Sequence, residues 1–339
     1  MRRALKLTAV SIIFAAKSVI AQQRPQYTQY AFNNYLLNPA VSGIENYTDV
    51  KLGYRKQWTG LDGAPVTGYF TVNMPLGAKF INGDATAMPA AGGENPLSRS
   101  YTQEYMAAEP HHGVGLMIVN DKAGPLTQTT INATYAYHIG LTPKLNLALG
   151  VSGGITHTGL NTSEINLEYD YDPAIANGRV SQSNPDLGAG LWLYTADFYV
   201  GASVQQLLKE TLYFSTNNSY NQSQTVPQYF LTAGVKLFVN DDITLMPSVL
   251  FKTVKPVPAT FDFTLKMAFK SNFWIGGSYR RNDAFAAMAG INISSLINIG
   301  YSYDITTSNL NTVSNGTHEI VLGILLNNRY KVTCPMRSF

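Results

Sequence analysis

The chain has 339 residues, of which 13% are charged and 12% aromatic, with 21 Tyr and 28 Gly. The charged share is about half of that in ordinary soluble proteins, yet the mean hydropathy is only −0.05. The sequence lacks any apolar run of about 18 residues, which excludes a bundle of transmembrane helices. Collagen, coiled-coil and disulfide-rich compositions are excluded as well, and an all-β protein with few surface charges is the class that remains.

The first residues have the features of a secretory signal peptide. Three basic residues precede a largely apolar stretch over 7–16, which is too short to span a bilayer, and Ala21 is the small residue before a cleavage site. We therefore expect a signal peptide over 1–21 and a mature chain over 22–339. The signal peptide holds four basic residues and no acidic one, so the formal charge of +3 becomes −1 after cleavage. Such a charge gives no reason to expect a nucleic-acid partner.

Alternation of apolar and polar residues with a period of two dominates the mature chain. Over 261–269 every second residue is Phe, Leu or Met, and the residues between them are Asp, Thr, Lys and Ala. Ranges 297–305 and 145–155 repeat the pattern. Alternation over about nine to eleven residues is typical of a tilted strand that crosses a membrane.

The polar faces of these strands distinguish a membrane barrel from a soluble sandwich. A sandwich carries many charges on its outer face, whereas these faces consist mainly of Gly, Ser, Thr and Asn. Tyr and Trp gather near the expected strand ends, as the aromatic girdles of a membrane barrel require. The residues concerned are Tyr54, Trp58, Tyr69, Tyr135, Tyr137, Tyr194, Tyr301 and Tyr303. The sequence thus predicts an outer-membrane β-barrel.

The pattern yields fourteen strands of a transmembrane antiparallel up-and-down barrel. An even number brings both chain ends to the periplasmic side, as is usual in bacterial barrels. The expected strands are 48–58, 65–75, 112–121, 128–140, 145–158, 186–195, 198–207, 226–239, 243–253, 259–269, 273–281, 285–293, 296–305 and 316–327.

The chain therefore divides into three parts after the signal peptide. We expect an N-terminal segment in the periplasm or lumen over 22–47, the barrel over 48–327 and a periplasmic tail over 328–339. Longer connections rich in Asn, Ser and Thr would be extracellular. A long insertion over 76–111 falls on the periplasmic side, where short turns are usual, and could be a plug, an arm for a partner or a disordered insertion.

Charged residues on the polar faces would point into the lumen. The lumen-facing candidates are Lys51, Arg55, Asp262, Lys266, Arg280, Asp304 and Glu319. One interpretation is a selective pore or a binding lumen, because fourteen strands enclose more space than side chains usually fill. The other is a barrel filled by its own ion pairs and loops, which the mixture of both charge signs favours.

Barrel closure makes a sharper prediction. The last strand must pair antiparallel with the first, because an open edge in lipid leaves backbone groups unsatisfied. Arg55 and Glu319 then lie near the same end of neighbouring strands and both point inward. We expect them to lie within reach of an ion pair.

A search for catalytic and cofactor motifs gives no candidate. The sequence contains no HExxH, GxSxG, P-loop or paired-cysteine motif, and its single cysteine, Cys334, cannot form an intramolecular disulfide. We expect neither an enzyme nor a cofactor.

Two groups of residues are possible metal ligands. His111 and His112 are adjacent, and adjacent residues of a strand point to opposite faces, which argues against a shared ion. Glu168, Asp170 and Asp172 alternate, so their carboxylates could share one face, as in a weak calcium site. A solvated acidic loop explains the same three residues.

Several stretches together resemble the PorP/SprF family. They are Gln26 to Ala40, Tyr54 to Pro65, Val119 to Gly124, Pro247 to Leu250, Phe273 to Arg280, Ile299 to Asp304 and Gly316 to Ile320. The resemblance covers nearly the whole mature chain. The insertion over 76–111 departs from the family, which usually has a short turn there, so its role does not carry over.

The resemblance implies an outer-membrane component of the type IX secretion system of Bacteroidota. It implies that some members associate with periplasmic peptidoglycan-binding and ring components, while others are dedicated to one cargo. Cargo-dedicated members help to export or retain a surface adhesin by engaging its C-terminal domain, in some cases for gliding motility. The resemblance does not separate these subtypes. Two other function classes stay open from the barrel itself: a passive or ligand-selective outer-membrane transporter, and an outer-membrane enzyme, whose nucleophile–base pair could not be recognised from sequence spacing.

Overall fold

A computed structural model describes residues 25–77, 105–165, 179–212, 223–270, 272–294 and 296–328. The expected signal peptide, most of the insertion over 76–111, the acidic residues Glu168, Asp170 and Asp172, and nearly all of the C-terminal tail lie outside this part of the chain. In the part that is described, no helix has the length and apolar character needed to cross a membrane.

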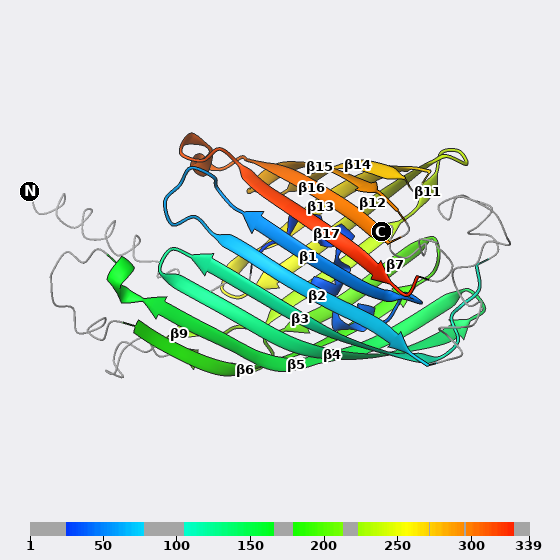
Figure 1. Ribbon diagram of the computed structural model, residues 1–339, viewed down its shortest axis with the longest axis horizontal. Coiled ribbons are helices and arrows are strands. Elements are labelled where there is room, and N and C mark those ends of the chain that lie inside the picture. Colours follow the sequence, from blue (N-terminus) through cyan, green and yellow to red (C-terminus); the bar gives the residue numbers. More distant parts are fainter. Residues whose placement is uncertain are drawn as a thin grey trace, which may run out of the picture.

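The described residues form a closed antiparallel barrel of fourteen strands (Figure 1). The strands are β1 (Thr48–Lys56), β2 (Val66–Leu76), β3 (His111–Ala123), β4 (Leu126–Thr142), β5 (Leu145–Asn161), β6 (Arg179–Tyr194), β7 (Phe198–Gln205), β10 (Gln228–Val235) continued by β11 (Leu237–Phe238), β12 (Ile243–Val254), β13 (Val257–Phe269), β14 (Phe273–Arg280), β15 (Ala284–Asn292), β16 (Ile297–Thr306) and β17 (Thr317–Leu326). A separate small hairpin consists of β8 (Thr211–Leu212) and β9 (Ser223–Gln224). Each of the fourteen predicted strands is confirmed.

Closure occurs between the first and the last strand. β1 pairs antiparallel with β17 from Thr48 opposite Leu326 to Lys56 opposite His318. On the far side of the ring, β10 pairs with both β7 and β12. The sheet therefore has no open edge, which satisfies the backbone in a solvent that cannot form hydrogen bonds.

The outer surface carries the apolar faces that the alternation predicts. In β13, Phe263 is 43% exposed, whereas its neighbours Asp262 and Thr264 are 4% and 0% exposed. In β16, Tyr301 is 44% exposed and Ser302 is fully buried. Because the sheet is closed, the buried residues face the lumen and the exposed apolar residues form the belt that meets lipid.

Three aromatic residues expected in the girdle lie elsewhere: Tyr69 and Tyr194 face the lumen, and Trp58 lines a cavity at one end of the barrel. Tyr69 is 4% and Tyr194 is 1% exposed. Tyr69 packs edge-on against Tyr27, with ring centroids 5.4 Å apart, and the hydroxyl of Tyr194 lies 3.0 Å from Nδ1 of His138. This part of the prediction was wrong because the lumen is not wholly polar, and large aromatic residues have partners inside it.

Residues 25–47, which we call the plug, run through the lumen before β1 begins (Figure 1). The plug contains three short 3-10 turns, η1 (Thr28–Phe32), η2 (Asn34–Leu36) and η3 (Pro39–Val41). The hydroxyl of Tyr30 lies 3.2 Å from that of Thr264 in β13, and the hydroxyl of Tyr35 lies 2.7 Å from that of Thr134 in β4. Since β4 and β13 lie nearly opposite each other in the ring, the plug contacts both sides of the barrel.

Apolar side chains join the plug to the wall. The ring of Phe32 lies 5.9 Å from that of Trp274. A buried cluster combines plug residues with inward-facing wall residues, namely Tyr27, Tyr30, Ala31, Phe32, Tyr35, Leu36, Leu37, Tyr69, Met117, Val119, Phe230, Met246, Leu250, Ala268, Trp274, Met288 and Val321. The barrel therefore contains a hydrophobic core of its own, separate from the apolar belt outside.

Glycines on the inner wall allow the plug backbone to come close. A Cβ atom at Gly150 in β5 would lie 2.3 Å from the backbone nitrogen of Ala40, and one at Gly113 in β3 would lie 1.8 Å from the carbonyl oxygen of Ser42. Both contacts are with backbone atoms, which a side-chain rotation cannot relieve. Some of the many glycines are therefore needed so that the backbone at and just after η3 can pack directly against the inner wall.

The two ends of the barrel differ in their connections. One end, here called the loop end, has four connections of nine or more residues, 57–65, 162–178, 206–227 and 307–316, and short ones at 124–125, 255–256 and 281–283. The opposite end, the turn end, has the short connections 143–144, 195–197, 239–242, 270–272 and 293–296, and one long exception at 77–110, which is the insertion noted in the sequence. The plug begins at the loop end with Pro25 and reaches the turn end at Thr48, where β1 starts.

The outward position of Phe263 can be tested by placing a charge there. Phe263→Arg should cost about 2–4 kcal/mol, because the residue lies in the middle of β13 and a charge near the bilayer midplane is costly. The readout is the fraction of barrel that keeps its folded mobility on a gel after graded heating. Phe263→Leu, which keeps an apolar side chain, should behave like the natural protein. Equal losses in both variants would contradict a lipid-facing position.

Candidate functional site

The ion pair expected at the closure is present at the loop end. Arg55 and Glu319 lie directly opposite each other in the β1–β17 register. Nη1 of Arg55 donates to Oε2 of Glu319 at 3.0 Å, and the two side chains are 3% and 0% exposed. The prediction that these residues pair is confirmed.

Arg55 also joins a third strand and the plug. Its Nη2 donates to Oδ2 of Asp304 in β16 at 2.9 Å. Thr28 in η1 donates its hydroxyl to the same oxygen at 2.5 Å and its backbone N–H to Oε2 of Glu319 at 2.8 Å. One buried guanidinium therefore links β1, β16 and β17, and the two carboxylates that it neutralises also fix the start of the plug.

A second arginine extends the network along the wall. Nε of Arg280 at the end of β14 donates to Oδ2 of Asp262 at 2.9 Å, and its Nη1 donates to Oδ2 of Asp283 at 3.0 Å. The same Nη1 lies 3.9 Å from Oδ2 of Asp304. Asp304 thus connects the two arginines across β16, β15 and β14.

The structure places all seven lumen-facing candidates inside, each no more than 5% exposed. It brings five of them into this network, namely Arg55, Asp262, Arg280, Asp304 and Glu319. The other two lie elsewhere. Lys51 pairs with Asp49 near the turn end, and the amine of Lys266 lies 5.3 Å from the ring of Trp274.

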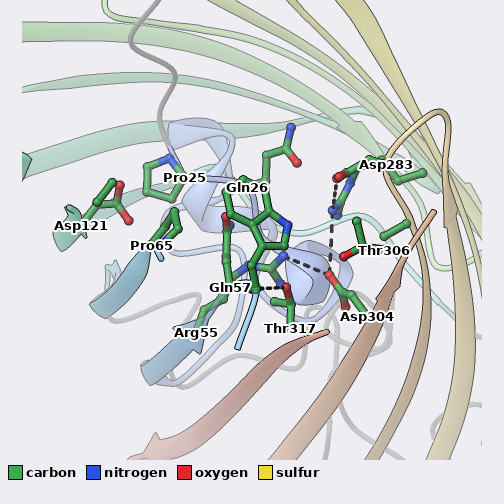
Figure 2. A pocket seen from close by; sticks show the side chains of 14 residues that line it. Pro25, Gln26, Arg55, Gln57, Pro65, Asp121, Asp283, Asp304, Thr306 and Thr317 are labelled. Atoms are coloured by element: carbon green, nitrogen blue, oxygen red, sulfur yellow. Dashed lines mark hydrogen bonds and ion pairs between the residues drawn. The ribbon is translucent and has the colours of Figure 1, made fainter. Parts of the chain in front are cut away.

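A cavity of about 300 Å³ opens beside the network at the loop end (Figure 2). Its charged lining consists of Arg55, Arg280, Asp121, Asp283 and Asp304. Figure 2 labels Arg55, Asp121, Asp283 and Asp304 among the lining side chains, together with Pro25 and Gln26 from the plug. The cavity therefore lies between the first residues of the plug and the ends of β1, β3, β14, β16 and β17.

Sequence reasoning missed the plug side of this site. Thr28 carries no charge and belongs to no alternating stretch, so nothing in the pattern assigned it to the network. Asp283 was missed because it lies in a turn, where parity gives no direction. The aromatic and amide residues between Gln26 and Asn38 were a signal, because such a composition is unusual for a periplasmic linker.

The histidines considered as metal ligands have other contacts. His111 faces the lumen, where its ring stacks on that of His138 with centroids 4.5 Å apart, and its Nε2 lies 3.0 Å from the carbonyl oxygen of Gly43. His112 points outward, and its Nδ1 lies 2.6 Å from the hydroxyl of Tyr135. Within the described ranges, no group of three or more His, Cys, Asp or Glu residues is placed to hold a metal ion. The acidic trio at 168, 170 and 172 lies outside those ranges.

The comparison with protein families decides which family the chain represents. The family described as "Type IX secretion system membrane protein PorP/SprF" matches residues 19–324. The chain belongs to the PorP/SprF family. The family match and the barrel together identify an outer-membrane component of the type IX secretion system, and the family suggests a role other than catalysis. No curated protein matches the chain.

Solved structures with a similar fold are outer-membrane barrels. The toluene transporter TbuX of Ralstonia pickettii is 11% identical, with a TM-score of 0.49, over 86% of this chain and 92% of that chain. A FadL homologue of Pseudomonas aeruginosa is 11% identical, with a TM-score of 0.46, over 89% of this chain and 94% of that chain. The outer-membrane protein Omp33 of Acinetobacter baumannii is 8% identical, with a TM-score of 0.44, over 84% of this chain and 99% of that chain.

The network gives a direct prediction for Arg55. Arg55→Leu should lower the free energy of unfolding by about 3–5 kcal/mol, because Asp304 and Glu319 would keep buried charges without their partner. Urea unfolding of the purified barrel, followed by tryptophan fluorescence, measures the change. Lys56→Leu alters the next residue, which is exposed, and should change stability by less than about 0.5 kcal/mol. Similar small changes in both variants would show that the network does not stabilise the barrel.

Proposed function

We propose that this PorP/SprF protein is a plugged scaffold of the type IX secretion system that assists the export or surface retention of one adhesin-type cargo by engaging the C-terminal domain of that cargo. The observation that carries the proposal is the plug. Residues 25–47 occupy the lumen along its length and are tied to both sides of the wall. A barrel filled in this way offers its two ends, rather than a wide channel, to other proteins.

The orientation of the barrel assigns the ends to different partners. In outer-membrane barrels the longer loops are extracellular and the short turns periplasmic, so the loop end with its cavity would face the outside. A surface adhesin would be engaged there. The turn end would face the periplasm, where peptidoglycan-binding and ring components of the secretion system are expected partners. A role in gliding motility would follow only if the retained adhesin is a motility adhesin.

The alternative of a ligand-selective or passive transporter is less well supported. A diffusing solute would have to displace a plug that shares a hydrophobic core with the wall. The plug is also held by hydrogen bonds from Thr28 to Glu319 and Asp304 and by close backbone packing against Gly150 and Gly113. We accordingly propose a non-enzymatic, non-channel role.

The cargo proposal predicts a selective secretion defect. A strain that lacks this protein should lose one surface adhesin while other type IX cargo is still secreted, because a dedicated scaffold serves a single substrate. Proteomics of the cell surface and of the culture medium measures both quantities. Loss of all type IX cargo would point instead to a general component.

Co-purification provides the direct test of engagement. The full-length protein, solubilised from the outer membrane with an affinity tag, should retain the C-terminal domain of that adhesin. A tagged barrel of another family from the same membrane serves as the control. Recovery of the domain with the control alone or with neither barrel would contradict the proposal.

Conductance separates the scaffold from the transporter. The purified protein in a planar lipid bilayer should give no stable open-channel current, because the plug obstructs the lumen. A porin of known conductance, inserted under the same conditions, controls for successful insertion. A steady current from the natural protein would favour the transporter.

A further inference from the structure

We propose that the cavity at the loop end binds a guanidinium or ammonium group, presented as an arginine or lysine side chain on an extended segment of the secreted partner. This inference rests on the proposed function and adds the chemistry of the contact. The cavity volume of about 300 Å³ lies at the lower limit of small-ligand pockets. It fits one long side chain and its flanking backbone, not a folded domain.

The arginines of the cavity are already neutralised from behind. Arg55 donates to Glu319, and Arg280 donates to Asp262, in each case at 2.9–3.0 Å. Neither Glu319 nor Asp262 lines the cavity. Each arginine has a carboxylate in the wall and also binds one that lines the cavity, because Arg55 donates to Asp304 and Arg280 donates to Asp283. The two positive charges are therefore shared among five carboxylates, those of Asp121, Asp262, Asp283, Asp304 and Glu319, and a negative excess remains.

Three aspartates face that opening. Asp121, Asp283 and Asp304 line the cavity from three different parts of the barrel, namely β3, the turn after β14 and β16. One further inward-facing lysine, Lys252 in β12, is buried and lies over the ring of Phe230 at 5.7 Å. Among the inward-facing residues that the structure describes here, the five carboxylates outnumber the cations even with Lys252 counted, so their field favours a positive ligand over an anion.

Asp304 has an acceptor atom to spare. The residue is 2% exposed, and its Oδ2 takes the hydrogen bonds from Thr28 and Arg55. Its Oδ1 is buried and has no hydrogen-bond partner among the described residues. Buried carboxylate oxygens are normally paired, and a ligand with several N–H donors would supply the missing bond.

An aromatic residue also lines the cavity. Trp58 lines the cavity, and its φ of +43° is a left-handed conformation that bulky residues rarely adopt. The backbone N–H of Trp58 donates to Oγ1 of Thr317 at 3.1 Å, which ties this conformation to the start of β17. An indole face beside carboxylates is a common way to bind a guanidinium or ammonium group.

The cavity can be reached from the loop end but continues into the plug. The side chain of Asp283 is 32% exposed, and Gln57 and Pro65 on the rim are half-buried. Pro25 and Gln26, the first described residues of the plug, form part of the lining. A side chain can therefore dock from outside, whereas its passage through the barrel would meet the plug.

Calorimetry with short peptides tests the inference on the full-length purified protein. An N-acetylated, C-amidated Gly-Gly-Arg-Gly-Gly peptide should bind at low ionic strength, and binding should weaken as salt is added. The matched Gly-Gly-Gln-Gly-Gly peptide should not bind. Asp283→Asn should weaken binding of the arginine peptide about tenfold, because it removes one charge-assisted contact.

Asp242→Asn is the control variant, because it removes one carboxylate at the turn end, where Asp242 pairs with Lys270 at 3.4 Å. It should leave peptide binding unchanged. Both variants should keep the heat-resistant gel mobility of the folded barrel. Absence of binding to the natural protein, equal binding of the glutamine peptide, or equal weakening by Asp242→Asn would each overturn the cation site.

Two further results separate the possible sources of the ligand. If argininamide binds as tightly as the peptide, the cavity is a cation site, but the proposal that it recognises an extended peptide segment is overturned. If the peptide fails to bind while the adhesin domain still co-purifies, this inference fails and the proposed scaffold function stands. If the adhesin domain does not co-purify, the proposed function itself fails.

Discussion

The buried guanidinium of Arg55 is the interaction on which the rest of the structure depends. It lies at the seam where β1 meets β17, and it is bound by carboxylates from β16 and β17. The same carboxylates accept the hydroxyl and the backbone N–H of Thr28. Because an unpaired charge in a dry lumen is very costly, the seam of the barrel and the start of the plug stabilise each other. Opening the seam would leave Arg55 or its carboxylate partners buried without an opposite charge.

The plug makes the interior of this barrel resemble the core of a soluble protein. Lipid covers the outer belt, so apolar residues outside gain nothing from contact with one another that lipid does not also give. Inside, the aromatic residues of the plug are removed from water against Met117, Met246 and Trp274, and the hydrophobic effect applies in full. Inner-wall glycines such as Gly150 let the backbones approach. The barrel is thus stabilised by two separate apolar surfaces: an outer belt that contacts lipid, and an inner core between plug and wall that is removed from water.

Sequence reasoning succeeded where a rule of period or closure applied. Alternation located each strand, since lipid on one side and the lumen on the other impose a period of two. Closure placed Arg55 opposite Glu319, since an unpaired edge is not tolerated in lipid. Asp304 joined the pair only because the β16–β17 register sets Ser302 opposite Glu319 and thereby brings Asp304 alongside. The alternation along a strand tells which face a residue such as Asp304 lies on, but not which residue of the next strand it contacts.

The same reasoning failed where local rules give no direction. Tyr69 and Tyr194 were assigned to the girdle by residue type, and only the presence of aromatic partners inside the lumen reverses that choice. The plug itself has no repeated period, so its path depends on tertiary contacts. Its start is fixed by contacts between distant parts of the chain, because Thr28 precedes the first strand while Asp304 and Glu319 belong to the last two strands. The carboxylates that pair with Arg55 across the barrel seam therefore also hold the loop end of the plug, and no local sequence rule could have predicted that arrangement.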